Sequence, residues 1–145
     1  LRKEVTLDED QRSEAKCRGA DAVLLICSLL SAAQLGEYLA QVQELGLSAL
    51  VEAHTAGEVQ MALAAGAEII GVNNRNLKDF SVNPLNSLRL RDAIPASKIF
   101  VAESGIQCAA DAKALKQAGV QAVLVGEALM RSANAAAMLK EMRDA

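Results

Sequence analysis

The stretch Ile69-Ile70-Gly71-Val72-Asn73-Asn74-Arg75-Asn76-Leu77 decides the fold, because a short apolar run in it stops abruptly in amides and an arginine. The run is too short for a helix and contains β-branched residues, which is typical of a buried parallel strand. Asn73 and Asn74 offer hydrogen-bond donors and acceptors, and Arg75 carries a fixed positive charge. Three such side chains at a strand end indicate a functional site; a solvated, Asn-rich turn is the alternative interpretation.

One unit recurs on both sides of this stretch: a glycine where a helix ends, followed by a short apolar strand. Glycine permits the left-handed backbone conformation that closes a helix before the chain turns into the next strand. Helix starts follow the strands, with capping patterns at Ser31, Thr55 and Asn83-Pro84. The expected strands are 22–27, 49–51, 69–72, 99–102 and 122–125, and the glycines are Gly19, Gly46, Gly66 and Gly119, with none before the strand 99–102.

About five complete βα units, preceded by a strand remnant that ends in Lys3, predict an α/β fold with a parallel sheet, either open or closed into a barrel. We expect a single domain over residues 1–145, because no linker or low-complexity stretch divides the chain. After the remnant, Asp8-Glu9-Asp10-Gln11 predicts a capping box that opens a helix. A chain that starts inside a strand is expected to be a piece of a longer protein.

The composition excludes several classes of partner. A net charge of −3 and a pI near 5.2 give no electrostatic footprint for nucleic acid. No apolar run approaches the roughly 18 residues that a membrane span needs. Cys17, Cys27 and Cys108 are odd in number and widely spaced, so we expect reduced, buried thiols in a cytoplasmic protein, and no metal site. The expected partner is a small molecule.

The strand ends carry a second pattern, because parallel βα-barrels place their chemistry at the carboxyl ends of the strands. Since side chains alternate across a strand, Glu52 shares a face with Leu50, and Glu103 shares one with Val101. We expect the polar ends to converge, although each carboxylate taken alone could be a loop residue or a helix cap. These ends are Lys3, Glu52, Asn73, Glu103-Ser104-Gly105 and Gly126-Glu127.

Glycine occurs at two successive strand ends, in Ser104-Gly105 and in Gly126-Glu127. Without a side chain there, backbone N–H groups can approach a ligand, and the second pair begins a short helical run, Glu127–Met130. The arrangement resembles the phosphate site that barrels form from their last two loops and a short helix. Glycines that merely form turns are the alternative.

At their spacings, these segments resemble the carboxy-terminal part of the indole-3-glycerol phosphate synthase family. The resemblance rests on Val51-Glu52, Ile70–Leu77, Ala102–Ile106 and Leu124–Arg131, and it covers essentially the whole chain. It implies a (β/α)8 TIM barrel, of which this chain holds the part from the end of strand three through strand eight. It also implies a lyase of tryptophan biosynthesis that uses no cofactor. That enzyme closes the ring of 1-(2-carboxyphenylamino)-1-deoxyribulose 5-phosphate with loss of carbon dioxide and water.

The resemblance further implies roles for individual residues. Lys3 matches a general acid on strand three, and Asn73 matches an amide on strand six. Glu52 and Glu103 match the carboxylates of strands five and seven. The chemistry of ring closure allows either of them to serve as the base or to stabilise a cationic intermediate. His54 is expected to face solvent or to cap the following helix rather than to act as a base.

For the phosphate, the resemblance implies a separate set of residues. Glu127 is expected to contribute its backbone rather than its charge, and Arg75 a positional role beside the site. The full set is Arg75, Ser104, Gly105, Gly126 and Glu127.

The chain departs from the family pattern in three places. Glu4-Val5 stands where an acid and an aromatic residue are usual, and Ala128 replaces a frequent serine. The family's Glu and Lys of strand one and its Ser-Pro-Ser segment would lie upstream of Leu1. A non-catalytic, phosphate-binding half-barrel is therefore an alternative, which would pair with the missing amino-terminal half or self-associate through its open edges. Phosphoribosylanthranilate isomerase is a further alternative, but its Cys and Asp pair has no counterpart at these strand ends.

Overall fold

The computed structural model describes residues 1–5, 16–76 and 78–145, with backbone only at positions 2, 4 and 5. The expected capping box at 8–11 lies outside the described residues. The described part forms a six-stranded sheet in the order β1-β2-β3-β4-β5-β6, and each neighbouring pair is parallel. Strand order follows chain order, as repeated βα units require.

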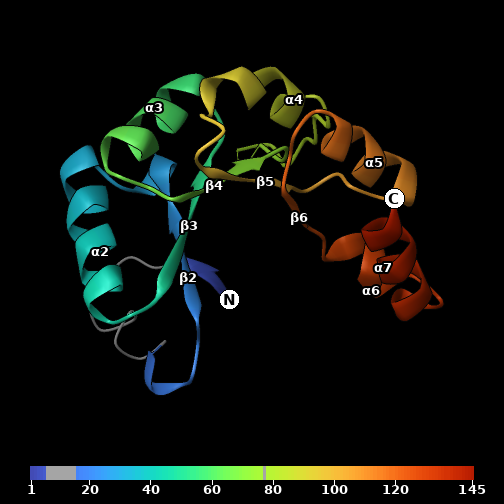
Figure 1. Cartoon of the computed structure of the whole chain (residues 1–145), viewed down its shortest axis with the longest axis horizontal. Coiled ribbons are helices and arrows are strands. Elements are labelled where there is room, and N and C mark those ends of the chain that lie inside the picture. Colours follow the sequence, from blue (N-terminus) through green and yellow to red (C-terminus); the bar gives the residue numbers. More distant parts are fainter. Residues whose placement is uncertain (6–15, 77) are drawn as a thin grey trace.

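The strands alternate with helices that follow one another along the outside of the curved sheet (Figure 1). The predicted α/β fold, a partial barrel of parallel βα units, is confirmed. The strands are β1 (Arg2–Val5), β2 (Ala22–Ile26), β3 (Ser48–Ala53), β4 (Ile69–Asn73), β5 (Ile99–Glu103) and β6 (Ala122–Leu124). The helices are η1 (Cys27–Leu29), α2 (Ala32–Glu44), α3 (Ala56–Ala64), α4 (Asn86–Leu90), η2 (Arg91–Ala93), α5 (Ala109–Gln117), α6 (Glu127–Arg131) and α7 (Ala135–Asp144).

The two faces of the sheet bury different sets of side chains. The outer face packs under the helices and forms the large core, to which the strands contribute Leu25, Val51, Ile70, Val72, Phe100 and Ala102. The inner face buries a smaller cluster of Leu24, Ile26, Leu50 and Val101. Because alternation places Glu52 with Leu50 and Glu103 with Val101, the inner face becomes polar at the carboxyl ends of its strands.

The local signals for helix ends hold in most places. Gly19, Gly46, Gly66 and Gly119 all have positive φ angles, of 76°, 65°, 89° and 82°. Ser31 and Gln34 form the expected capping box of α2. The prediction that Asn83-Pro84 starts a helix is wrong, because α4 begins at Asn86. The Asn83 side chain instead accepts a hydrogen bond from the Leu85 N–H (3.1 Å), which closes a turn before the helix.

The prediction of three buried cysteines is wrong for two of them. Cys17 and Cys108 are exposed, and only Cys27 is buried. Cys108 is the N-cap of α5, where its backbone N–H donates to Asp111 (3.1 Å) and the helix start keeps it at the surface. Burial raises the pKa of the Cys27 thiol to about 12, so this group stays protonated near neutral pH.

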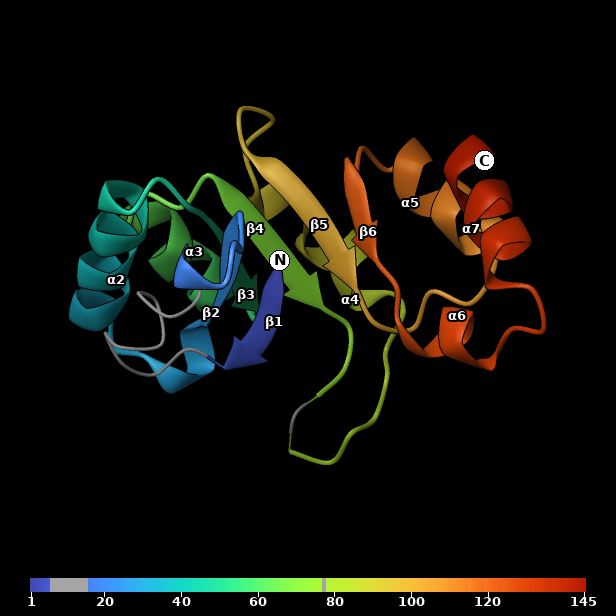
Figure 2. The same cartoon turned by 90° about the horizontal axis from the view of Figure 1, so that it is seen from below.

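The connection between β4 and α4 extends away from the sheet at the end where the arrowheads of β4 and β5 point (Figure 2). It begins at Asn74 and carries Arg75 and Val82, which form an isolated bridge with each other. Within the described residues, no helix has both the length and the apolar character to cross a bilayer.

Candidate active site

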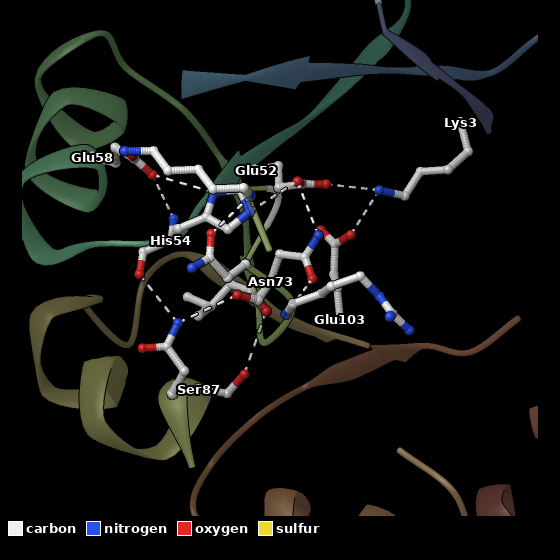
Figure 3. Close-up of polar contacts among 12 residues, drawn as sticks. Lys3, Glu52, His54, Glu58, Asn73, Ser87 and Glu103 are labelled. Carbon is white, nitrogen blue, oxygen red and sulfur yellow. Dashed lines mark hydrogen bonds and ion pairs between the residues drawn. The ribbon is translucent and has the colours of Figure 1, made fainter. Parts of the chain in front are cut away.

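An ammonium group lies between two carboxylates at the carboxyl ends of the strands (Figure 3). Lys3 Nζ donates to Glu52 Oε2 at 2.9 Å and to Glu103 Oε2 at 2.8 Å. Both carboxylates are almost completely buried, at 2% and 1% exposure, whereas the Lys3 side chain is 34% exposed. The structure thus brings together three residues that are 49 and 100 positions apart in the chain.

Lys3 reaches this place from an irregular strand, β1, which is the first strand of the sheet among the described residues. The sequence predicted a remnant that ends in Lys3, but β1 continues to Val5, so that prediction is wrong. Arg2 pairs with Val23 and Val5 pairs with Leu24, so three steps along β1 match one step along β2. Such a bulge redirects side chains, and Lys3 lies inside it.

Asn73 extends the cluster on the neighbouring strand. Its Nδ2 donates to Glu52 Oε1 (3.0 Å), and its Oδ1 accepts from the Arg75 N–H (2.9 Å). Asn86 of α4 in turn donates to the Asn73 carbonyl (3.3 Å) and to the His54 carbonyl (3.1 Å). The Asn73 amide is therefore held at both ends, and it fixes the orientation of the Glu52 carboxylate.

Gly71 makes room for the Glu103 side chain. A Cβ at Gly71 would overlap Glu103 Oε1 and would lie 3.1 Å from Leu50 Cδ1. Glu103 Oε1 is buried and has no hydrogen-bond partner among the described residues. A protonated carboxyl group tolerates such a site better than an anion does, because a neutral group loses less hydration.

The two carboxylates have opposite pKa shifts. Burial alone would raise the pKa of Glu52, but hydrogen bonds from Lys3 and Asn73 hold it below its ordinary value. Burial raises the pKa of Glu103 to about 7, and the nearby Glu52 charge adds to that effect. Burial would lower the pKa of Lys3, but its bonds to Glu103 and Glu52 keep it above the ordinary value. Near pH 7, Lys3 and Glu52 are charged while Glu103 can hold or release a proton, which is the requirement for acid–base chemistry.

This shift predicts a pH effect on the stability of the chain. Unfolded Glu103 releases its proton near the ordinary glutamate pKa of 4.5 and folded Glu103 near 7, so the unfolding free energy falls as pH rises between these values. Glu103→Gln should remove that fall, worth at most roughly 3 kcal/mol, so the variant gains stability relative to the parent between pH 5 and pH 8. Urea unfolding followed by circular dichroism measures the difference. Glu44→Gln, on the exposed surface of α2, is the control, and an equal pH dependence in parent and Glu103→Gln would contradict the assignment.

His54 does not face solvent, contrary to one of the two expectations for it. Its side chain is 15% exposed, and its Nε2 lies 3.5 Å from Glu52 Oε1. Alternation along β3 was the available signal, because residues two apart share a face. The helix cap at this point is formed by Thr55, whose Oγ1 accepts from the Glu58 N–H (3.2 Å).

Sequence reasoning also missed a buried polar network behind the strand ends. The Asn74 side chain accepts from the Ser87 N–H (2.9 Å) and hydroxyl (2.8 Å), and donates to the Ser104 carbonyl (3.0 Å). It ties the end of β4 to α4 and to the end of β5. Ser87 gave no local signal, because nothing in the pattern around it distinguishes a buried hydroxyl from an exposed one.

The residues expected to bind phosphate line a cavity of about 710 Å³ at the carboxyl ends of β5 and β6. Ser104 and Gly105 have positive φ angles of 65° and 73°, and a Cβ at Gly105 would meet Val82 Cγ1 at 2.6 Å. Gly126 is the residue before α6. The cavity is lined by all five predicted residues, Arg75, Ser104, Gly105, Gly126 and Glu127.

Three charged side chains that line this cavity form ion pairs with one another. Arg75 Nη2 donates to Glu127 Oε2 at 2.9 Å, and Arg131 lies 3.3 Å from Glu127 Oε1. The Glu127 carboxylate is thereby paired with two guanidinium groups. Among the described residues, no group of three or more His, Cys, Asp or Glu side chains is placed to hold a metal ion.

Known proteins match the chain over nearly its whole length. A model of the indole-3-glycerol phosphate synthase family matches residues 1–142. The indole-3-glycerol phosphate synthase of Ruminiclostridium cellulolyticum is 52% identical over 143 residues, which are 99% of this chain and 55% of that protein. The enzyme of the same name from Endomicrobium trichonymphae is 53% identical over 144 residues, 99% of this chain and 56% of that protein. The chain thus spans about half the length of the curated relatives it matches.

A solved structure shows the same fold at low sequence identity. The 3-hexulose-6-phosphate synthase from Salmonella typhimurium matches with a TM-score of 0.77 at 17% identity, over 94% of this chain and 67% of that one. At this identity the likeness concerns the fold alone. The sequence matches, by contrast, favour the first of the two enzyme families expected from the sequence over the isomerase.

Proposed function

Because the chain belongs to the indole-3-glycerol phosphate synthase family, we propose that it supplies the carboxy-terminal catalytic part of a synthase of tryptophan biosynthesis. The reaction is ring closure of 1-(2-carboxyphenylamino)-1-deoxyribulose 5-phosphate with loss of carbon dioxide and water. The observation that carries the proposal is the ammonium of Lys3 held 2.9 and 2.8 Å from two buried carboxylates at the strand ends. Indole fluorescence of a full-length synthase carrying this sequence, supplied with that substrate, tests it.

Lys3 is proposed as the general acid. Ring closure onto the substrate ketone needs a proton on the carbonyl oxygen, and the later loss of hydroxide needs another. Its position between Glu52 and Glu103 keeps Lys3 protonated, because both carboxylates favour the cation. The Lys3 side chain is partly exposed, so a ligand at the carboxyl ends of the strands can reach it.

Glu52 is proposed as the base that removes a proton from the new ring. Its lowered pKa keeps it ionised at neutral pH, and its orientation is fixed by Asn73. Glu103, with a pKa of about 7, is proposed to stabilise the cationic intermediate when ionised. The division of roles rests on the opposite pKa shifts of the two groups.

The substrate phosphate is proposed to bind at Ser104, Gly105, Gly126 and Glu127, with Arg75 placed by its pairing to Glu127. Backbone N–H groups at two adjacent strand ends offer several donors to one anion. The Glu127 carboxylate forms ion pairs with Arg75 and Arg131. This agrees with phosphate binding by the Glu127 backbone rather than by its charge.

This phosphate site predicts a binding result for the chain itself. Titration of the labelled chain with inorganic phosphate should shift the amide NMR signals of Ser104, Gly105, Gly126 and Glu127. The amides of Gly46 and Gly66 serve as an internal control, because these glycines precede β3 and β4 at the opposite ends of the strands. Unchanged amide signals at the four site residues would refute the proposed phosphate site.

A further inference from the structure

The imidazole of His54 lies between two carboxylates (Figure 3). Its Nε2 is 3.5 Å from Glu52 Oε1, and its Nδ1 is 3.5 Å from Glu58 Oε2. Side-chain exposure rises along this row, from 2% at Glu52 through 15% at His54 to 22% at Glu58. The row therefore leads from the buried proposed base toward the surface.

A second cavity, of about 510 Å³, opens at the outer end of this row. His54 and Glu58 line it, and Glu52 is not among its lining residues. The cations that line this cavity are Arg75, Lys78 and Arg89, from the β4–α4 connection and α4. The cavity thus offers a route for protons between Glu58 and solvent.

Helix capping explains only part of this arrangement. Glu58 Oε2 accepts from the His54 backbone N–H at 2.6 Å, which stabilises the start of α3. Asn86 holds the His54 carbonyl. Neither contact involves the imidazole, and His54 Nε2 is buried without a hydrogen-bond partner among the described residues. The direction of the ring toward Glu52 therefore needs a separate reason.

We propose that Glu58, His54 and Glu52 form a proton relay that returns the proton taken by Glu52 to solvent. The inference rests on the proposed function, because it assumes that Glu52 is the base. His54 acts through Glu52, whose Oε1 lies 3.5 Å from its Nε2, and is therefore a positioning residue.

The relay moves one proton and no electrons. Glu52 Oε1 gains a proton from the substrate and passes it to His54 Nε2, while His54 Nδ1 releases a proton to Glu58 Oε2 or to water in the outer cavity. Imidazole can accept at one nitrogen and donate at the other, which makes it suited to this step. Glu52 is thereby returned to its ionised form for the next turnover.

The contacts can be tested without any activity measurement, because His54 is the only histidine of the chain. In the labelled chain, Glu52→Gln should change the ¹⁵N shift of His54 Nε2, and Glu58→Gln should change that of Nδ1. Glu44→Gln, on the exposed surface of α2, should change neither. An unchanged Nε2 shift in Glu52→Gln would overturn the proposal.

Turnover in a full-length synthase tests the relay itself. His54→Gln should lower kcat by roughly tenfold or more and change KM by less than about twofold, because the loss affects proton transfer and not binding. Added imidazole should restore part of kcat in His54→Gln and in Glu58→Gln, but not in Glu52→Gln. A structural defect would not depend on the buffer, so a loss of kcat that imidazole does not relieve, or no loss at all, would overturn the relay. An inactive parent synthase would instead refute the proposed function, while the NMR result still decides the contacts.

Discussion

Glu52→Gln in a full-length synthase carrying this sequence should lower kcat by roughly 10²-fold or more. Glutamine keeps the size of the side chain, but its single amide oxygen can replace only one of the two Glu52 oxygens that accept from Lys3 and Asn73. It cannot take up a proton and carries no charge. Steady-state indole fluorescence measures the loss.

The control variants separate catalysis from folding. Glu44→Gln removes a carboxylate from the exposed surface of α2 and should leave kcat unchanged. Glu52→Gln should keep the circular dichroism spectrum of the parent. A rate near that of the parent would assign the base to Glu103, whose carboxylate shares the Lys3 ammonium with Glu52.

Local patterns in the sequence predict the strands and their polar ends. The apolar run Ile69–Val72 and the glycines before the strands are signals within a few residues, and the structure follows them closely. Alternation also predicts that Glu52 and Glu103 lie on one face, since this needs only the period of a strand.

Local sequence patterns do not predict contacts between segments that are distant in the chain. The bulge of β1 that holds Lys3 between two carboxylates depends on how β1 pairs with β2, and no local signal shows that register. The space above Gly71 that Glu103 fills is likewise visible only when β4 and β5 are side by side. The position of His54 was derivable from alternation, but its partner Glu58 comes from the following helix.

A second large effect is expected for the 145 residues on their own, which should bind phosphate but not turn the substrate over. The chain corresponds to about half of each relative, and the family resemblance places further catalytic residues in the other half. Residues that act as a unit lose nearly all activity together, because the remaining groups do not each supply a partial rate.

The geometry of the sheet also favours the absence of turnover by the chain on its own. Within the described residues, β1 and β6 each have a neighbour on one side only, and Lys3 lies on β1. An ammonium on an open edge is poorly shielded from water, which weakens acid catalysis. We propose that a partner segment equivalent to the amino-terminal part of the relatives covers these edges.

Indole fluorescence, recorded for this chain alone and after addition of a separately expressed amino-terminal part of a synthase, tests the central claim most directly. The account predicts no turnover by the chain alone and turnover on mixing, which Glu52→Gln in the chain should lower by roughly 10²-fold or more. Turnover by the chain alone, or mixtures that remain inactive although the two parts form a stable complex, would contradict it.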